Sequence, residues 1–142
     1  MKLLSICMEK NPGNFETLKE EWNEYKLSNN DVIKLKTVVS DITFELNKYN
    51  VEQPNLISTN IIYIISSESG EPAVKVDIEK AEKVRIGIVE ARDVWNEYRT
   101  KNRTIKIKSF ITSIFKVSNM YDKNKKPVYL ILTSNVIEDW GV

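Results

Sequence analysis

The chain has 142 residues, a hydrophobic fraction of 42%, a charged fraction of 29% and a formal net charge of +1. These values are typical of a single globular domain, and no apolar run reaches the length of about 18 residues that spans a membrane. We therefore expect a cytoplasmic protein with no membrane partner. There is no histidine and one cysteine, Cys7, which excludes histidine-dependent catalysis, histidine metal sites and an intrachain disulfide.

The clearest pattern along the chain is an internal repeat. The tetrapeptide Trp-Asn-Glu-Tyr occurs at residues 22–25 and again at 95–98, an offset of 73. The similarity continues from residues 33–40 to residues 105–112, and further matches follow Pro54 and Pro127. Two copies are too few for a solenoid. We predict one domain, residues 1–142, built from two repeats, about 1–67 and 73–142, that are related by a pseudo-twofold axis.

Each repeat begins with two segments whose apolar residues recur at steps of three and four, which predicts amphipathic helices. In the first repeat the two apolar faces contain Phe15, Leu18, Trp22 and Tyr25, then Val32, Leu35, Val39, Ile42, Leu46 and Tyr49. In the second they contain Val84, Ile88, Ala91, Trp95 and Tyr98, then Ile107, Ile111, Ile114 and Tyr121. Asn14 is a predicted cap of the first helix, residues 27–30 are a predicted break, and the Trp and Tyr side chains are expected in a helix–helix core.

The rest of each repeat has the composition of strands. Residues 60–65 and 128–132 are β-branched and aromatic, residues 67–72 and 122–126 are turn-like, and residues 74–78 alternate in polarity. With residues 3–7 as a fourth strand, the predicted fold is α+β: a duplicated β-α-α-β unit giving a four-stranded antiparallel sheet packed on four helices. The alternative is an all-α bundle with pseudo-twofold symmetry, in which residues 60–66 form a buried helix.

Catalytic motifs are missing from the sequence. The four glycines are scattered, so there is no phosphate-binding loop. Glu20, Glu21 and Glu24 fall on the exposed side of a predicted helix, where a solvated face is the better interpretation than an acid/base pair. We expect a non-enzymatic protein with no catalytic residue, no metal site and no cofactor.

Charge is distributed unevenly between the two halves. Residues 1–71 contain 7 basic and 11 acidic side chains, and residues 72–142 contain 14 basic and 9 acidic ones. Nine basic residues fall between positions 99 and 126, with Asp122 as the one acidic residue there: Arg99, Lys101, Arg103, Lys106, Lys108, Lys116, Lys123, Lys125 and Lys126. If residues 105–121 were a helix, Lys106, Ser109, Ser113 and Lys116 would share one side. The nine cations predict either a nucleic-acid-binding surface or ordinary solvated lysines that face the acidic first repeat.

These observations favour a regulatory or adaptor protein that acts through protein–protein association or self-association. Halves of opposite charge suit electrostatically guided docking, and the edges of a small sheet need cover. Trp140 near the C-terminus either packs or anchors a partner. Nucleic-acid binding by the basic second repeat is the alternative function.

Overall fold

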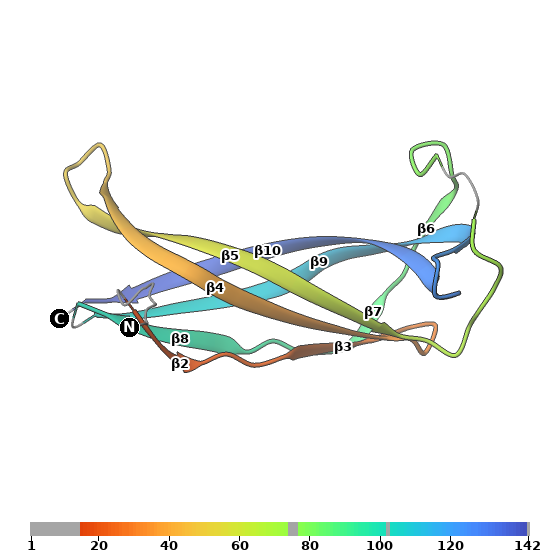
Figure 1. Ribbon diagram of the computed structural model, residues 1–142, viewed down its shortest axis with the longest axis horizontal. Helices are drawn as coiled ribbons and strands as arrows, with labels where there is room; N and C mark the ends of the chain where they lie inside the picture. Colours follow the sequence, from red (N-terminus) through yellow and green to blue (C-terminus); the bar gives the residue numbers. More distant parts are fainter. Residues whose placement is uncertain (1–14, 74–76, 102, 142) are drawn as a thin grey trace, which may run out of the picture.

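In the computed structural model, which describes residues 15–73, 77–101 and 103–141, every regular element is a strand (Figure 1). The strands are β2 (Glu16–Lys19), β3 (Asn23–Leu27), β4 (Val32–Leu46), β5 (Glu52–Ile65), β6 (Lys83–Arg85), β7 (Ile88–Arg92), β8 (Trp95–Thr100), β9 (Arg103–Tyr121) and β10 (Pro127–Trp140). The predicted α+β fold and its all-helical alternative are both wrong, because the described residues form two antiparallel sheets without a helix. Among them there is accordingly no helix able to cross a membrane.

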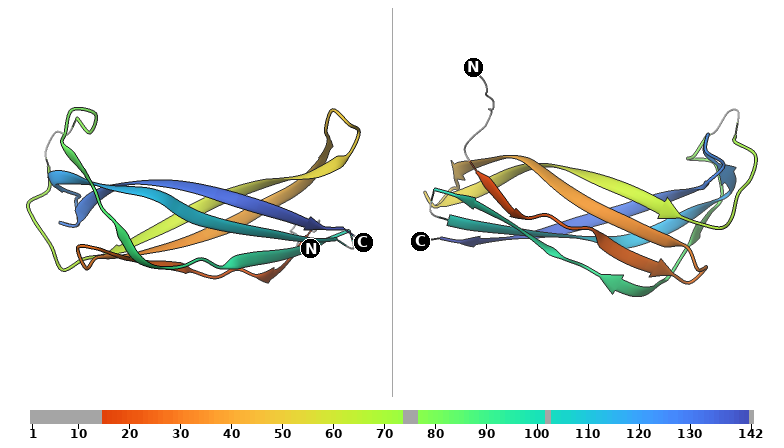
Figure 2. Two further views of the ribbon diagram at one scale, coloured as in Figure 1. Left: turned by 180° about the vertical axis from the view of Figure 1, so that it is seen from behind. Right: turned by 60° about the horizontal axis from the view of Figure 1, so that its bottom comes forward.

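Two long hairpins dominate the molecule. β4 and β5 form one and lie in the first sheet, of order β5-β4-β3-β7; β9 and β10 form the other and lie in the second sheet, of order β10-β9-β8-β2. β6 pairs with the later part of β9. The hairpins are twisted and cross each other along an elongated molecule, as the two views of Figure 2 show.

The short strands are exchanged between the two sheets. β2 precedes β3 in the chain but pairs with β8 of the second sheet. Reciprocally, β7 precedes β8 but pairs with β3 of the first sheet. Each sheet is therefore completed by a strand from the other half of the chain, and neither half can be removed without opening the other half's sheet.

The long strands form because polar and apolar residues alternate along them. In β4, Ile33, Leu35 and Val39 are at most 5% exposed, whereas Lys34 and Lys36 lie on the opposite face. Successive side chains of a strand point to opposite faces, so this alternation buries one face against the second sheet. The β-branched residues in these segments also favour the extended backbone.

The helical prediction failed because bulges interrupt this alternation. The register of β4 against β5 shifts between Val39 and Asp41, so the next buried residue after Val39 is Ile42. In β9, Ile111 and Ile114 flank a similar shift. A bulge inserts one residue and moves the following side chains to the other face, which converts steps of two into steps of three. Those steps of three imitate the spacing of a helix.

The core lies between the sheets in two clusters. One contains Tyr25, Leu27, Ile33, Leu35, Ile111, Ile114 and Tyr129, and the other contains Val39, Ile42, Tyr98 and Ile107. The repeated tyrosines, Tyr25 and Tyr98, are thus buried as expected, but between sheets. The repeated tryptophans are not core residues: Trp22 is 38% exposed beneath Lys36, and the half-buried Trp95 lies beneath Lys108.

Several predictions of extended segments and turns are confirmed. Residues 60–65 lie in β5 and residues 128–132 in β10, while turns at 28–30 and 123–125 close two hairpins. The predicted strand over residues 74–78 is not formed where it can be checked, because Ile78 lies in a turn and residues 74–76 are outside the described part. The predicted strand at 3–7, the cap at Asn14 and Cys7 also lie outside the described residues.

Candidate interaction surface

The nine basic residues divide between the two ends of β9. Arg99, Lys101, Arg103, Lys106 and Lys108 lie in β8, in the β8–β9 turn and in the first part of β9, whereas Lys116, Lys123, Lys125 and Lys126 lie near its end and in the β9–β10 turn. β9 has 19 residues, and at about 3.3 Å per residue its ends are roughly 60 Å apart. The residues that are clustered in sequence therefore form two groups in space. The predicted helix side of Lys106, Ser109, Ser113 and Lys116 does not exist, and Ser109 is only 6% exposed.

Acidic residues of the first half neutralise part of the basic stretch. Arg103 forms ion pairs with Glu52 of β5 and, at 2.8 Å, with Asp139 of β10, and its guanidinium lies 4.5 Å from the Phe44 ring centroid. The Arg103 side chain is only 19% exposed. It joins β4, β5 and β10 at one end of the molecule. Lys116 is paired in the same way with Glu68 at the other end.

Other cations of the stretch contact rings or carbonyl groups. The Lys106 ammonium lies 4.7 Å from the Trp140 ring centroid, and the Lys108 ammonium lies 5.1 Å from the Trp95 ring centroid. Lys101 lies over Phe44. Lys126 donates a hydrogen bond of 3.2 Å to the Ser66 carbonyl. The remaining three, Arg99, Lys123 and Lys125, are exposed.

Two asparagines from the repeated tetrapeptide, Asn23 and Asn96, bridge the halves of the chain from buried positions. The Asn23 amide oxygen accepts from the Val94 N–H at 2.9 Å, and its nitrogen donates to the Ser109 carbonyl at 2.6 Å. The Asn96 amide oxygen accepts from the Glu21 N–H at 3.1 Å, and its nitrogen donates to the Thr37 carbonyl at 3.0 Å. Both are 4% exposed. Each buried amide therefore both accepts from and donates to backbone of the other half.

The repeated tyrosines also reach carboxylates of the other half. Tyr98 donates to Glu20 at 2.6 Å, and Tyr25 donates to Asp93. Burial, followed by these hydrogen bonds, raises the pKa of each tyrosine hydroxyl well above its usual value near 10. At neutral pH both hydroxyls are therefore protonated and donate to fixed carboxylates. These hydrogen bonds stabilise the fold.

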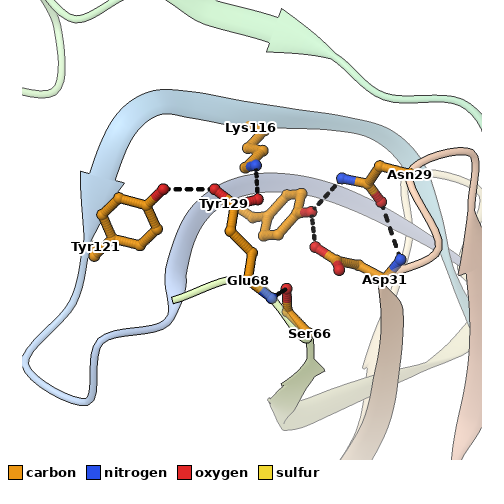
Figure 3. A network of polar contacts seen from close by, with 7 residues as sticks. All are labelled: Asn29, Asp31, Ser66, Glu68, Lys116, Tyr121 and Tyr129. Carbon is orange, nitrogen blue, oxygen red and sulfur yellow. Dashed lines mark hydrogen bonds and ion pairs between the residues drawn. The ribbon is translucent and has the colours of Figure 1, made fainter. Parts of the chain in front are cut away.

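A polar network fixes the end of the β9–β10 hairpin (Figure 3). Tyr129 donates to Asp31 and accepts from Asn29 at 2.8 Å, which ties β10 to the β3–β4 turn. Glu68 accepts from Tyr121 at 2.6 Å and from Lys116. The hydrogen bond from Lys116, then that from Tyr121, lowers the pKa of the Glu68 carboxyl, so this group is an anion at neutral pH.

A cavity of about 390 Å³ adjoins this network and is lined in part by Asn29, Glu68 and Lys116. Two of its charged side chains, Glu68 and Lys116, are paired with each other. No group of three or more potential metal ligands occurs in the parts of the chain that the structure describes.

An exposed apolar row lies on the edge strand β5. β4 covers one side of β5, and no described strand pairs with the other side. Ile61, Tyr63 and Ile65 lie opposite Lys36, Lys34 and Val32 of β4, on the outer face of the sheet, and are 46%, 62% and 45% exposed. Residues 53–67 contain no charged side chain. The edge thus combines unpaired backbone groups with an apolar row.

The corresponding edge strand of the second sheet, β10, is more polar. The positions of β10 that are equivalent to Ile61, Tyr63 and Ile65 in strand pairing are Val136, Glu138 and Trp140, which lie opposite Lys108, Lys106 and Thr104 of β9. The sequence alone identified the basic residues but not the β5 edge, because an edge is defined by the order of strands. The one signal in the sequence is the apolar run 61–65 itself, whose composition predicts a buried strand.

Comparison with known proteins gives no relative: no family model, curated protein or solved structure matches the chain.

Proposed function

We propose that the chain is a non-enzymatic, cytoplasmic regulatory or adaptor protein that binds other protein chains at the open edge of β5. The observation that supports this most is the exposed row of Ile61, Tyr63 and Ile65 beside an unpaired strand edge. Binding by strand addition obtains affinity from main-chain hydrogen bonds and specificity from alternate side chains.

Natural sheets protect their edges with charged side chains, proline or short strands. β5 has 14 residues, its one proline, Pro54, stands near its start, and its first 13 residues after Glu52 are uncharged. An exposed edge of this kind is an aggregation hazard unless a partner covers it, which supports a binding role.

Nucleic-acid binding by the second half ranks below this proposal. Its support is the contact of Lys106 with Trp140 and of Lys108 with Trp95, since cations beside aromatic rings are common where single strands stack. Glu97 and Glu138 both lie directly opposite Lys106 in the sheet, which reduces the positive potential at this position.

A labelled peptide tests whether the edge accepts a strand. The probe is a peptide of residues 58–67, flanked by lysines to keep it dispersed, and its binding is followed by fluorescence anisotropy. We expect binding to the wild-type chain that Tyr63→Glu weakens about tenfold or more, because a charge is placed on the apolar row. Val136→Glu is the matched control, since Tyr63 and Val136 lie opposite Lys34 and Lys108 respectively, so each new carboxylate has a lysine beside it. Equal binding by wild type and Tyr63→Glu, or no binding to either, would contradict the proposal.

A further inference from the structure

Residues 61–65 have the sequence Ile-Ile-Tyr-Ile-Ile, which reads the same in both directions. We infer that this segment is the centre of a symmetric dimer, in which β5 of one copy pairs antiparallel with β5 of a second copy about Tyr63. The inference rests on the proposed function and names the partner: another molecule of the same chain.

The palindrome matters because of the geometry of antiparallel pairing. A twofold axis at Tyr63 sets Tyr63 opposite Tyr63 of the partner, Ile61 opposite Ile65 and Ile62 opposite Ile64. Directly opposed Cβ atoms lie about 4.5–5.5 Å apart, so each pair is in contact. The interface is self-complementary and closed. It joins the four-stranded sheet of one copy to the four-stranded sheet of the other in one continuous sheet.

The chemistry of the edge suits a second copy. On the outer face, Ile61, Tyr63 and Ile65 of both chains would form one continuous apolar strip, which reduces the exposure of side chains that are now 45–62% exposed. The nearest charged residues along the chain are Glu52 and Glu68, outside the palindrome at either side. No like charges are brought opposite each other within the paired segment.

The same pairing is unfavourable at β10. The equivalent outward row of β10, Val136, Glu138 and Trp140, has a carboxylate at its centre, and Glu138 is followed by Asp139. Self-pairing about Glu138, the equivalent of Tyr63, would place two carboxylates directly opposite each other, which is destabilising. The two edges are therefore unequal, and the dimer closes instead of extending into a filament.

The overlap of five residues is short. A standard stable interface buries about 1,200–2,000 Å² in total. An edge-to-edge contact of this length falls at or below the lower end of that range, so we expect reversible association in the micromolar range.

Sedimentation velocity over a range of protein concentrations tests the dimer. We expect the wild-type chain to pass from monomer to dimer, with Tyr63→Glu raising the dissociation constant about tenfold or more, because two carboxylates then face each other on the axis. Val136→Glu should leave the dissociation constant unchanged. Circular dichroism of each variant confirms that its strand content is retained.

Cysteine cross-linking tests the register. In a Cys7→Ser background, Tyr63→Cys should form a disulfide-linked dimer on mild oxidation, whereas Val136→Cys should not. A chain that stays monomeric at all concentrations overturns the dimer. If that monomer still binds the peptide of residues 58–67, the proposed function stands without it. If the monomer binds no peptide, both fail. A dimer that persists in Tyr63→Glu and is lost in Val136→Glu overturns the assignment to β5.

Discussion

Asn23 and Asn96 show what the repeated tetrapeptide does for the fold. The sequence identified these positions as repeated, but it placed them on helices beside the more conspicuous tryptophans. In the structure the tryptophans are partly exposed, and the asparagines are 4% exposed and hydrogen-bonded to backbone of the other half. A buried amide is retained where it satisfies backbone groups that have no other partner.

Replacing Asn96 with leucine should therefore be strongly destabilising. The variant leaves the Glu21 N–H and the Thr37 carbonyl without their partner, and we expect a loss of about 2–4 kcal/mol in the free energy of unfolding. Urea denaturation followed by circular dichroism measures this. Asn55→Ala is the control, because Asn55 is exposed and donates to Glu45 on the surface; we expect a change within about 0.5 kcal/mol. Similar losses in both variants would show that Asn96 has no special role.

At the scale of elements, the sequence predicted turns and the β-branched segments of β5 and β10, but it missed β4, β9 and the short strands. The turn at 28–30 and the strands at 60–65 and 128–132 were found because β-branched runs and turn residues act locally. β4 and β9 were predicted as helices, since their bulges depend on pairing with β5 and β10, which a single segment does not reveal. For the same reason the open edge of β5 could not be predicted, although its apolar residues could.

The loop between β5 and β6 is fixed to β9 by a close contact at Gly70. A Cβ at this position would lie 2.4–2.7 Å from the Tyr121 ring, and the ring is held by the hydrogen bond to Glu68. Gly70→Ala should therefore cost about 1–3 kcal/mol of stability by overpacking.

A double-mutant cycle identifies the cause of that loss. In a Tyr121→Ala background the ring is gone, and Gly70→Ala should cost less by about 1 kcal/mol or more. Gly141→Ala is the control, because no atom lies within 4 Å of its added Cβ. If the cost of Gly70→Ala is the same with and without Tyr121, the contact does not determine the position of the loop.

At the scale of the whole molecule, the opposite charges of the two halves are partly matched inside one chain. Arg103 and Lys116 of the basic half are paired with Glu52 and Glu68 of the acidic half. Together with the exchange of β2 and β7, these contacts make the halves interdependent. The sequence showed the charge asymmetry, but the pairing depends on which strands meet. Duplication of an ancestral unit stays a prediction, supported by equivalent contacts at the offset of 73.

Three buried tyrosines also make the two halves of the chain interdependent. Tyr25 donates to Asp93, Tyr98 to Glu20 and Tyr129 to Asp31, so each bond joins one half of the chain to the other. Burial, then the hydrogen bond to the carboxylate, raises the pKa of all three hydroxyls. In the unfolded chain they ionise near pH 10.

These shifts predict cooperative alkaline unfolding. The stabilisation is fully present below about pH 10 and is lost as the pH rises above it, because the unfolded chain then releases protons that the folded chain retains. Each tyrosine should lower the free energy of unfolding by about 1.4 kcal/mol per pH unit in that range. The tyrosinate absorbance that comes from the three buried tyrosines should change together with far-ultraviolet circular dichroism, and Tyr98→Phe should make the dependence shallower. Ionisation of these tyrosines before any loss of strand signal would mean that the contacts between the halves open locally. The two halves would then be less tightly coupled than their exchanged strands require.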